Sequence, residues 1–267
     1  MLVGGNSTAS DFGRDLKTVI FDLERAQSVC TVEDLPLQLT RSVGDVIGGI
    51  PTICGGMKPN GAAPKSCFSL NIETKKWVEH EDVLKNGITE MAGVRLGNKL
   101  LITGGKRHAP VSLGREDESL RIIKQGRRMI EMPKFIDVKK RTQKPTVPKA
   151  DCIEIIEWNK DKTALTSTMS TVKLPEELYG HCVVALDNKL IFVMGGYSKT
   201  SNSVSKKTWM INTKTGKVKE EPDMLVGREA FGCHRIGRIV FASGGNNQRS
   251  TEYIDLSEKT PMWTKGI

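Results

Sequence analysis

A short apolar run that ends in Gly-Gly occurs five times along the 267-residue chain. The first glycines of these pairs stand at positions 4, 55, 104, 195 and 244, so three intervals are 49 to 51 residues long and one is 91. Self-similarity at a fixed period indicates a repeat architecture in which each unit packs on its neighbours. The long interval predicts an insertion of 42 residues in the middle unit.

Each unit reads as four short strands. A β-like run precedes each later Gly-Gly run, and two-residue hairpin turns are expected between them because Gly, Asn and Asp tolerate positive φ. These turns are Gly48-Gly49, Gly97-Asn98, Asp187-Asn188 and Ile236-Gly237. A third run places an apolar residue before Asp, Asn or Glu, as in Leu70-Asn71, and a fourth twice opens on tryptophan, at Trp77 and Trp263. Four antiparallel strands per unit predict a propeller blade.

These features resemble the kelch repeat family, in which Gly-Gly closes the second strand, an apolar-Asp step follows in the third and Trp opens the fourth. The family's Pro-Met loop and Arg are matched by Glu221-Pro222-Asp223-Met224 and Arg228. Three units depart from the pattern, with Ser28, Ala164 or Val218 in place of Trp. The resemblance implies an all-β fold, a kelch-type β-propeller. It also implies that Trp77 and Trp263 wedge between blades rather than bind a ligand.

We expect one propeller domain over 1–267, with blades at about 1–40, 41–86, 87–175, 176–226 and 227–267 and the insertion at 107–150. About five blades are visible, and the first lacks its inner strand. Members of the resembled family usually close with six blades, so we expect a partial product with an open sheet edge. A five-bladed ring closed by a non-local partner is the alternative.

Six cysteines lie at wide intervals, without the C-x-x-C or zinc-finger spacing of a metal site. We expect them to be buried free thiols, since a chain of this length does not need disulfides. Three disulfides are the alternative, and the sequon Asn6-Ser7-Thr8 favours it weakly. With no signal-peptide start and no apolar run of about 18 residues, we expect no membrane association and a cytoplasmic or nuclear location.

The insertion carries most of the chain's net charge of +9, since it holds 12 basic and 5 acidic residues. We expect a helix from Arg115 to Met132, followed by a flexible tail from Lys139 to Lys149. Two basic clusters ten residues apart have the shape of a bipartite signal for an import receptor. They are Arg127 and Arg128, then Lys139, Lys140 and Arg141. A solvated loop without a dedicated partner and an acidic or phosphate-bearing surface are the alternatives. Phe135 is its only aromatic residue, so base stacking on nucleic acid is not expected.

No known catalytic motif is present: the phosphate-binding loop, the nucleophile elbow and H-E-x-x-H are all missing. His181 and His234 fall in first strands near the channel, where a hydrogen-bonded histidine is the simpler interpretation than a metal ligand or general base. Three tyrosines do not assemble the copper site of a propeller oxidase. We therefore expect no metal, no cofactor and no enzymatic activity.

The resemblance implies a protein–protein interaction module that binds a peptide or protein through loops on one face. The candidate binding residues are Arg41, Lys58, Tyr197, Arg228, Asn246, Asn247, Gln248 and Arg249. Arg and Asn clusters suit an acidic peptide, whereas Arg41 and Arg228 could equally hydrogen-bond between blades. The family also implies a possible substrate receptor of a cullin-type ubiquitin ligase, if a BTB domain belongs to a longer chain. The alternatives are a propeller enzyme of the sugar oxidase or isomerase type and recruitment to the nucleus or nucleic acid through the basic loop.

Overall fold

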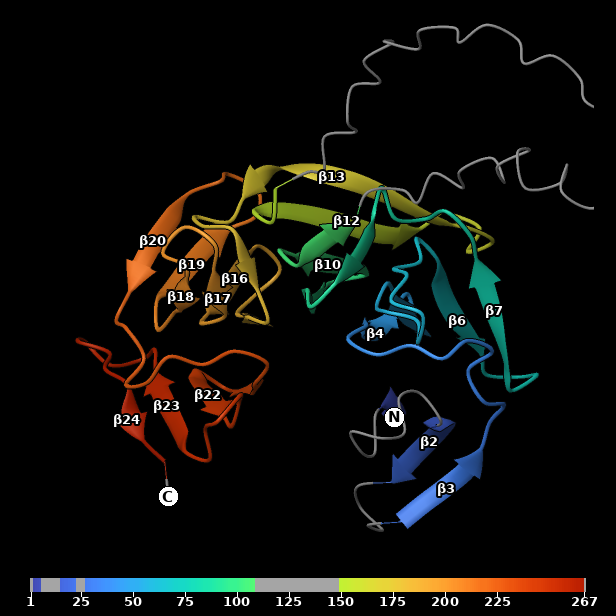
Figure 1. The fold of residues 1–267 in the computed structure, drawn as a ribbon, viewed down its shortest axis with the longest axis horizontal. Coiled ribbons are helices and arrows are strands. Elements are labelled where there is room, and N and C mark those ends of the chain that lie inside the picture. The colour runs from blue at the N-terminus through green and yellow to red at the C-terminus, as the bar shows by residue number, and fades with distance from the viewer. Residues whose placement is uncertain (1, 6–14, 23–26, 109–148, 267) are drawn as a thin grey trace, which may run out of the picture.

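The computed structural model describes residues 2–5, 15–22, 27–108 and 149–266 (Figure 1). These ranges form β-strands, turns and irregular segments without a helix, and so they hold no helix that is long and apolar enough to cross a membrane. The expected helix from Arg115 to Met132 lies outside the described residues, as does nearly all of the expected tail from Lys139 to Lys149.

Five sheets, which we number blades 1 to 5 in chain order, contain most of the strands. Blade 1 contains β1 (Leu2–Gly5), β2 (Asp15–Asp22) and β3 (Gln27–Thr31). Blade 2 contains β4 (Val43–Ile47), β5 (Ile50–Cys54), β6 (Cys67–Asn71) and β7 (Lys76–His80). Blade 3 contains β9 (Ala92–Leu96), β10 (Lys99–Thr103), β12 (Cys152–Trp158) and β13 (Leu165–Lys173).

Blades 4 and 5 complete the set. Blade 4 contains β15 (Cys182–Ala185), β16 (Leu190–Met194), β19 (Thr208–Asn212) and β20 (Val218–Glu221). Blade 5 contains β21 (Gly232–Ile236), β22 (Ile239–Ser243), β23 (Thr251–Asp255) and β24 (Thr264–Lys265). Two small sheets extend the loops, one from β8 (Gly87–Thr89) and β11 (Lys106–His108), the other from β14 (Leu178–Tyr179), β17 (Tyr197–Ser198) and β18 (Ser203–Val204).

The blades stand around a common axis as a β-propeller, which confirms the expected fold. Within blades 2 to 5 the four strands pair antiparallel in chain order, and the inner strands β4, β9, β15 and β21 lie beside one another. Blade 1 has the order β1-β2-β3, so no described strand takes the inner position there. Figure 1 shows the blades following one another around an arc, with blade 5 and blade 1 on either side of an opening.

The Gly-Gly pairs end the second strands where the chain passes close to the neighbouring blade. Both glycines of Gly195-Gly196 have positive φ, at 60° and 89°, which side-chain-bearing residues rarely adopt. A Cβ on Gly196 would lie 2.6 Å from the Cβ of His181 in the same blade. Glycine is therefore required here by both conformation and space.

The hairpin turns follow the expectation at Gly48-Gly49, where both residues have positive φ. The expectation of a two-residue turn at Asp187-Asn188 is wrong. Four residues, 186–189, separate β15 from β16, and the Asp187 carboxylate accepts hydrogen bonds from the amides of Lys189 and Leu190 at 2.7 and 2.8 Å. The aspartate side chain thus closes a wider loop without positive φ.

Both repeat tryptophans join two blades, as expected. The indole N–H of Trp77 donates to the carbonyl of Glu33 at 3.1 Å, and that of Trp263 donates to the carbonyl of Pro222 at 2.9 Å. Each acceptor lies in the segment that leaves the preceding blade. Trp263 also packs among apolar side chains of blades 4 and 5, including Phe192 and Met224. Each indole therefore fills space between blades and satisfies its own donor.

Two buried ion pairs reinforce the contacts between blades. In blade 5 the Arg228 Nε donates to Glu252 at 2.8 Å, and Glu252 also accepts the backbone amide of Leu225 at 2.6 Å. In blade 3 Glu154 accepts from Arg107 at 3.0 Å and from the backbone amide of Lys85, at the end of blade 2, at 2.8 Å. In both blades, a glutamate on the third strand therefore accepts a backbone amide from the segment that leaves the preceding blade.

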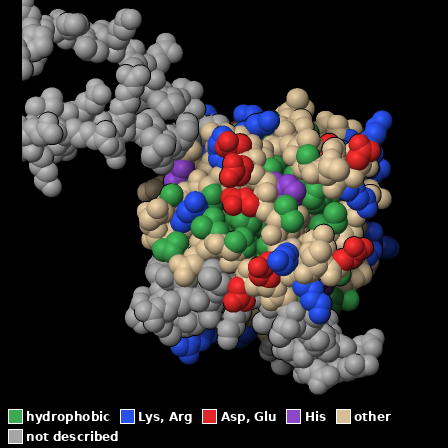
Figure 2. Space-filling view, turned by 90° about the vertical axis from the view of Figure 1, so that its right-hand side faces the viewer, with side chains coloured by type: hydrophobic (Ala, Val, Ile, Leu, Met, Phe, Trp, Pro, Cys, Tyr) green, Lys and Arg blue, Asp and Glu red, His purple; other side chains and the backbone are tan. Residues whose placement is uncertain are grey.

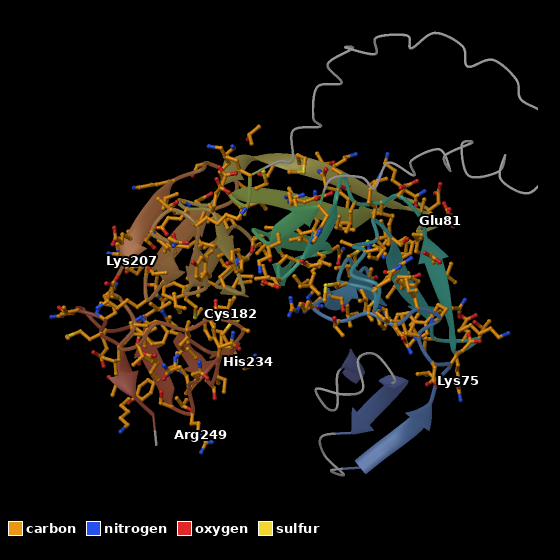
Figure 3. All side chains as sticks on the ribbon, in the orientation of Figure 1. Lys75, Glu81, Cys182, Lys207, His234 and Arg249 are labelled. Carbon is orange, nitrogen blue, oxygen red and sulfur yellow. A yellow bond between two sulfur atoms is a disulfide. The ribbon has the colours of Figure 1, made fainter. Side chains whose placement is uncertain are left out.

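The expectation of buried free thiols is wrong for four cysteines, which form the disulfides Cys54–Cys67 and Cys182–Cys233. Cys54 and Cys67 stand opposite each other on the paired strands β5 and β6. Cys182 and Cys233 are 51 residues apart and lie on the neighbouring inner strands β15 and β21 of blades 4 and 5 (Figure 3). The half-buried Cys152 is a free thiol, and burial raises its pKa.

The described surface carries charges of both signs. Figure 2 shows acidic, basic and hydrophobic side chains interspersed on the side of the molecule that faces right in Figure 1. Since the insertion accounts for +7 of the net charge of +9, the rest of the chain carries only +2.

Candidate binding pocket

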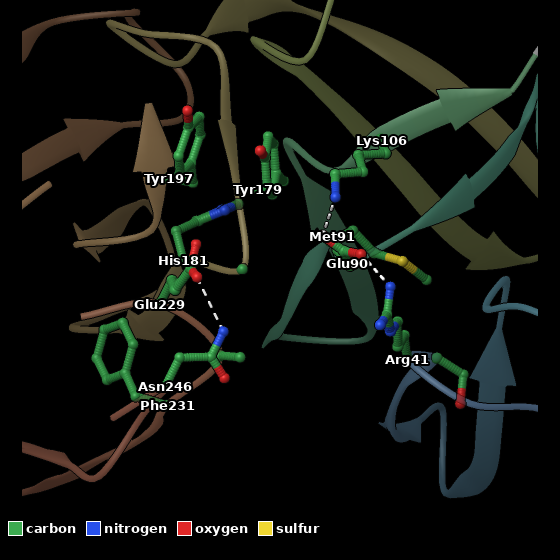
Figure 4. A pocket seen from close by; sticks show the side chains of 13 residues that line it. Arg41, Glu90, Met91, Lys106, Tyr179, His181, Tyr197, Glu229, Phe231 and Asn246 are labelled. Carbon is green, nitrogen blue, oxygen red and sulfur yellow. Dashed lines mark hydrogen bonds and ion pairs between the residues drawn. The ribbon is translucent and has the colours of Figure 1, made fainter. Parts of the chain in front are cut away.

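A pocket of about 580 Å³ opens where the loops of blades 2 to 5 converge on the axis (Figure 4). Eight of its thirteen lining residues come from the four segments that lead into the inner strands, at 41–42, 90–91, 180–181 and 230–231. The residues after the Gly-Gly pairs contribute Lys106, Tyr197 and Asn246.

One backbone position repeats around this pocket in the left-handed conformation. It is occupied by Arg41, Glu90, Gly180 and Ala230, with φ of 58°, 55°, 60° and 51°. The Ala230 amide donates to the Gly180 carbonyl, and the Gly180 amide donates to the Glu90 carbonyl, each at 2.8 Å. A non-glycine residue in this region is disfavoured by about 1 to 2 kcal/mol, and such residues cluster at functional sites. We call these four positions the left-handed ring.

Three charged side chains form one side of the pocket, which we call the basic wall: Arg41, Glu90 and Lys106. Glu90 takes a hydrogen bond from the Arg41 guanidinium through Oε1 and pairs with the Lys106 ammonium at 2.7 Å through Oε2. One carboxylate thus faces two cations, and the wall has a net charge of +1. Because Arg41 and Lys106 keep half and two fifths of their side-chain surface exposed, they remain open to a ligand.

Two tyrosines also line the pocket, Tyr179 beside Lys106 of the basic wall and Tyr197 on the far side of Tyr179 (Figure 4). Tyr179 and Tyr197 are opposite each other on β14 and β17, with stacked rings whose centroids are 5.0 Å apart. The Lys106 ammonium lies 4.0 Å from the Tyr179 ring centroid, within the range of a cation–π contact. Burial raises the pKa of the Tyr179 hydroxyl, against the opposing effect of Lys106, so this hydroxyl stays protonated at neutral pH.

The opposite side of the pocket, which we call the acidic wall, contains Glu229 and Asn246 together with Phe231 (Figure 4). The Asn246 side-chain amide donates to Glu229 Oε1 at 2.8 Å, and the Asn246 backbone amide donates to the Glu229 carbonyl at 2.9 Å. Glu229 forms no ion pair with any residue that the structure describes. Its second carboxylate oxygen is therefore available to a ligand donor.

His181 also lines the pocket but is almost fully buried. Its Nε2 lies 2.8 Å from the Thr103 hydroxyl, whose oxygen is 3.3 Å from the Ala92 carbonyl. If Nε2 carries the proton, the Thr103 hydroxyl donates onward to Ala92 and Nδ1 is a bare acceptor, without a partner in the described structure. Burial lowers the pKa of His181 to about 3. The ring is neutral at physiological pH, as expected of a hydrogen-bonded strand histidine.

The structure brings three of the candidate binding residues together in the pocket: Arg41, Tyr197 and Asn246. The remaining surface candidates do not line it. They are Lys58, Asn247, Gln248 and Arg249, of which Arg249 is exposed at the lower edge of blade 5 in Figure 3. The basic-loop candidates Arg127, Arg128, Lys139, Lys140 and Arg141 lie outside the described residues.

The expectation that Arg228 contributes to the binding face is wrong. Its side chain is 1% exposed, and besides Glu252 its guanidinium donates to the carbonyls of Gly244 and Ser250 and to the Ser250 hydroxyl, at 2.7 to 2.8 Å. All of these partners belong to blade 5. The backbone carbonyl of Arg228 accepts the amide of Gly196 in blade 4 at 2.7 Å, so this residue links blades 4 and 5 as the inter-blade alternative predicts, whereas the other arginine, Arg41, lines the pocket.

Sequence reasoning missed four residues that line the pocket: Glu90, Lys106, Tyr179 and Glu229. A signal for them exists in the repeat itself. Glu90 is 49 residues after Arg41, and Ala230, the neighbour of Glu229, is 50 residues after Gly180. Aligning the units on the segment before each inner strand would have placed Glu90, Tyr179 and Glu229 at the mouth of the channel, and aligning them on the Gly-Gly pairs would have placed Lys106 there.

Within the described residues, no group of three or more His, Cys, Asp or Glu side chains is arranged to hold a metal ion. The pocket offers instead one carboxylate shared by two cations, a stacked tyrosine pair and a second carboxylate held by an amide. This arrangement is suited to binding charged and aromatic groups through hydrogen bonds and ring contacts.

Comparisons with known proteins agree with this architecture. The kelch motif model matches residues 178–225, which cover most of blade 4. Kelch-like protein 40 of Xenopus laevis is 34% identical over 93 residues, which are 34% of this chain and 15% of that protein. The chain thus spans a small part of this curated relative. The solved structure of YjhT superposes with a TM-score of 0.61 at 11% identity, covering 91% of this chain and 74% of that one, a likeness of fold alone. Residues 178–225 thus match a kelch motif, and the chain as a whole is similar in fold to a solved propeller.

Proposed function

We propose that this protein is an interaction propeller that binds a peptide segment of a partner protein in the pocket on its axis. The observation that carries the proposal is the convergence of loops from four blades on one depression. Concave sites with a few convergent polar groups are the usual ligand sites of globular proteins. The stacked pair of Tyr179 and Tyr197 supplies the rigid aromatic surface on which peptide side chains are often held.

We propose that an acidic side chain of the partner contacts the basic wall. Arg41 and Lys106 share the single carboxylate of Glu90, so the wall keeps one uncompensated positive charge. A ligand carboxylate there accepts charge-assisted hydrogen bonds from two exposed cations. Support comes from this geometry and from the interaction role that kelch repeats commonly have.

Binding rather than catalysis is the second part of the proposal. His181 is the histidine that lines the pocket, and a pKa of about 3 makes it a weak base at neutral pH. A general base is effective when its pKa lies near the working pH. Tight metal in the purified protein, found by elemental analysis, would instead favour an oxidase-type enzyme.

We further propose two roles for a longer chain in the cell. Resemblance to kelch-like proteins supports a substrate receptor of a cullin-type ubiquitin ligase, tested by co-purification of the full-length gene product with a cullin. The two basic clusters support an intracellular protein bound by an import receptor, tested by deleting residues 127–141 and following loss of nuclear localisation.

The peptide-binding proposal is tested by selecting a displayed library of random peptides on the immobilised protein. Selected peptides are then measured by fluorescence anisotropy against Tyr197→Ala, Arg41→Ala and the control Arg238→Ala. Arg238 is exposed on the β21–β22 hairpin and is not in the pocket. We expect the two pocket variants to weaken binding at least about tenfold, since each removes a ring contact or a charged donor. Binding that is equal in all three variants would place the peptide elsewhere and refute the proposal.

A further inference from the structure

The charged residues of the pocket are divided between its two sides. Figure 4 shows Arg41, Glu90 and Lys106 on the side of blades 2 and 3, and Glu229 with Asn246 across from them on the side of blades 4 and 5. The first side has a net charge of +1 and the second a net charge of −1. A ligand that is complementary to the pocket must therefore itself carry two opposite charges.

The acidic wall has the features of a site for a cationic side chain. Glu229 forms its hydrogen bond with an amide, so its negative charge is not neutralised by any described cation. Phe231 and Tyr197 line the pocket on the same side and present aromatic rings. A carboxylate next to aromatic rings is the combination that holds a guanidinium or ammonium group, through an ion pair and cation–π contacts.

The two walls differ in what they already bind. On the basic wall the cations are held in place by Glu90, and Lys106 is fixed further by the ring of Tyr179. On the acidic wall the Asn246 side-chain amide donates to the Glu229 carboxylate, and the Asn246 backbone amide donates to the Glu229 backbone carbonyl. Each wall is therefore arranged before a ligand arrives, which lowers the entropy lost on binding.

We propose that the pocket recognises a peptide segment with one acidic and one basic side chain, the acidic one at Arg41 and Lys106 and the basic one at Glu229. This inference rests on the proposed function, which requires only that a peptide binds in the pocket. A segment with two acidic side chains would bring one of them to Glu229, where like charges repel. A segment with two basic side chains would bring one to the basic wall, with the same penalty.

The test uses blocked hexapeptides that contain one Glu and one Arg separated by zero to four Gly or Ser residues. Matched sets with two Glu or two Arg at the same separations serve as comparison, and affinity is measured by isothermal titration calorimetry. We expect at least one mixed-charge peptide to bind at least about tenfold more tightly than both same-charge peptides of equal spacing. Equal or tighter binding of a two-Glu peptide would overturn the proposal.

A double-mutant cycle then assigns the basic side chain to Glu229. The best mixed peptide and its form with citrulline in place of Arg, a neutral group of the same shape, are measured against wild type and Glu229→Gln. We expect Glu229→Gln to weaken the Arg peptide at least about tenfold and to leave the citrulline peptide within about twofold. Glu220→Gln, on the exposed strand β20, is the matched control and should change neither. Equal effects of Glu229→Gln on both peptides would contradict the assignment.

The two proposals fail in different ways. If the random library yields peptides that depend on Tyr197 but carry no paired charges, the peptide pocket stands and the two-charge inference is wrong. If no selected peptide responds to Tyr197→Ala or Arg41→Ala, the proposed function itself is wrong. Thermal unfolding of each variant, compared with wild type, separates lost binding from lost folding.

Discussion

Replacing Arg228 should destabilise the propeller more than any surface substitution does. The side chain is 1% exposed, as is that of Glu252, and its guanidinium donates four hydrogen bonds, to Glu252, Gly244 and twice to Ser250. Among the described residues, Arg228→Ala leaves the buried Glu252 carboxylate with the Leu225 amide as its partner, and it removes the side-chain donor from the Gly244 and Ser250 carbonyls. Breaking a buried ion pair on one side destabilises by about 3 to 5 kcal/mol, so we expect a loss of about 4 kcal/mol.

The measurement is urea unfolding followed by tryptophan fluorescence, with Arg238→Ala as the exposed control, expected to change stability by less than about 0.5 kcal/mol. The double variant Arg228→Met, Glu252→Leu tests the cause. Because it removes both charges and fills the space with apolar groups, it should recover a large part of the loss. A loss under about 1 kcal/mol for Arg228→Ala, or a double variant less stable than the single one, would refute this account of how blades 4 and 5 are held together.

Three other perturbations have expected outcomes. Replacing Cys182 and Cys233 by Ser should lower stability by about 2 to 4 kcal/mol, because the disulfide that joins blades 4 and 5 is lost. Reductant should lower the melting temperature of wild type by more than that of the variant, which retains only the Cys54–Cys67 disulfide, and an equal decrease in both would contradict this expectation. His181 has a folded-state pKa of about 3 against an ordinary 6.5, so its contribution to the free energy of unfolding is fully present above pH 6.5 and falls by about 1.4 kcal/mol per pH unit as the pH drops towards 3. The free energy of unfolding, measured by urea titration at each pH, should therefore fall less steeply with decreasing pH in His181→Gln than in wild type. An equal slope in the two proteins would contradict the assignment. Gly196→Ala would bring a Cβ to 2.6 Å from the Cβ of His181 and should abolish or strongly weaken folding, whereas Gly61→Ala, with open space around it and φ of 80°, should cost only about 1 kcal/mol in the same unfolding assay.

The repeat made the fold predictable from the sequence. Five Gly-Gly pairs in phase mark positions where positive φ and close approach exclude other residues, and this constraint survives when the rest of the unit varies. The position of Trp77 and Trp263 between blades was also predictable, because an indole there needs only a nearby carbonyl as hydrogen-bond acceptor, and the backbone supplies one. Local conformation and the repeat period therefore carried enough information for the architecture.

The site was less predictable because the sequence does not show whether a side chain before an inner strand is buried within the propeller or faces the pocket. Arg228 and Arg41 stand at closely related places before inner strands, yet one is buried with Glu252 and the other lines the pocket with Glu90. Arg41 occupies the left-handed position, whose counterpart before β21 is Ala230, two residues after Arg228, and residue type alone does not report this offset. The disulfide between Cys182 and Cys233 was missed for a similar reason: its spacing of one repeat has meaning only once the blades are placed side by side.

The left-handed ring has a consequence for how such a protein changes its ligand. Arg41, Glu90, Gly180 and Ala230 differ in charge and size but share one backbone geometry, which hydrogen bonds between neighbouring blades maintain at two of the positions. The fold therefore accepts different side chains at this position in each blade. Gly180 and Ala230 have almost no side chain. Substitution of these two residues by larger polar or charged ones, in evolution or by design, would therefore add functional groups to the pocket and change its specificity while the backbone stays as it is.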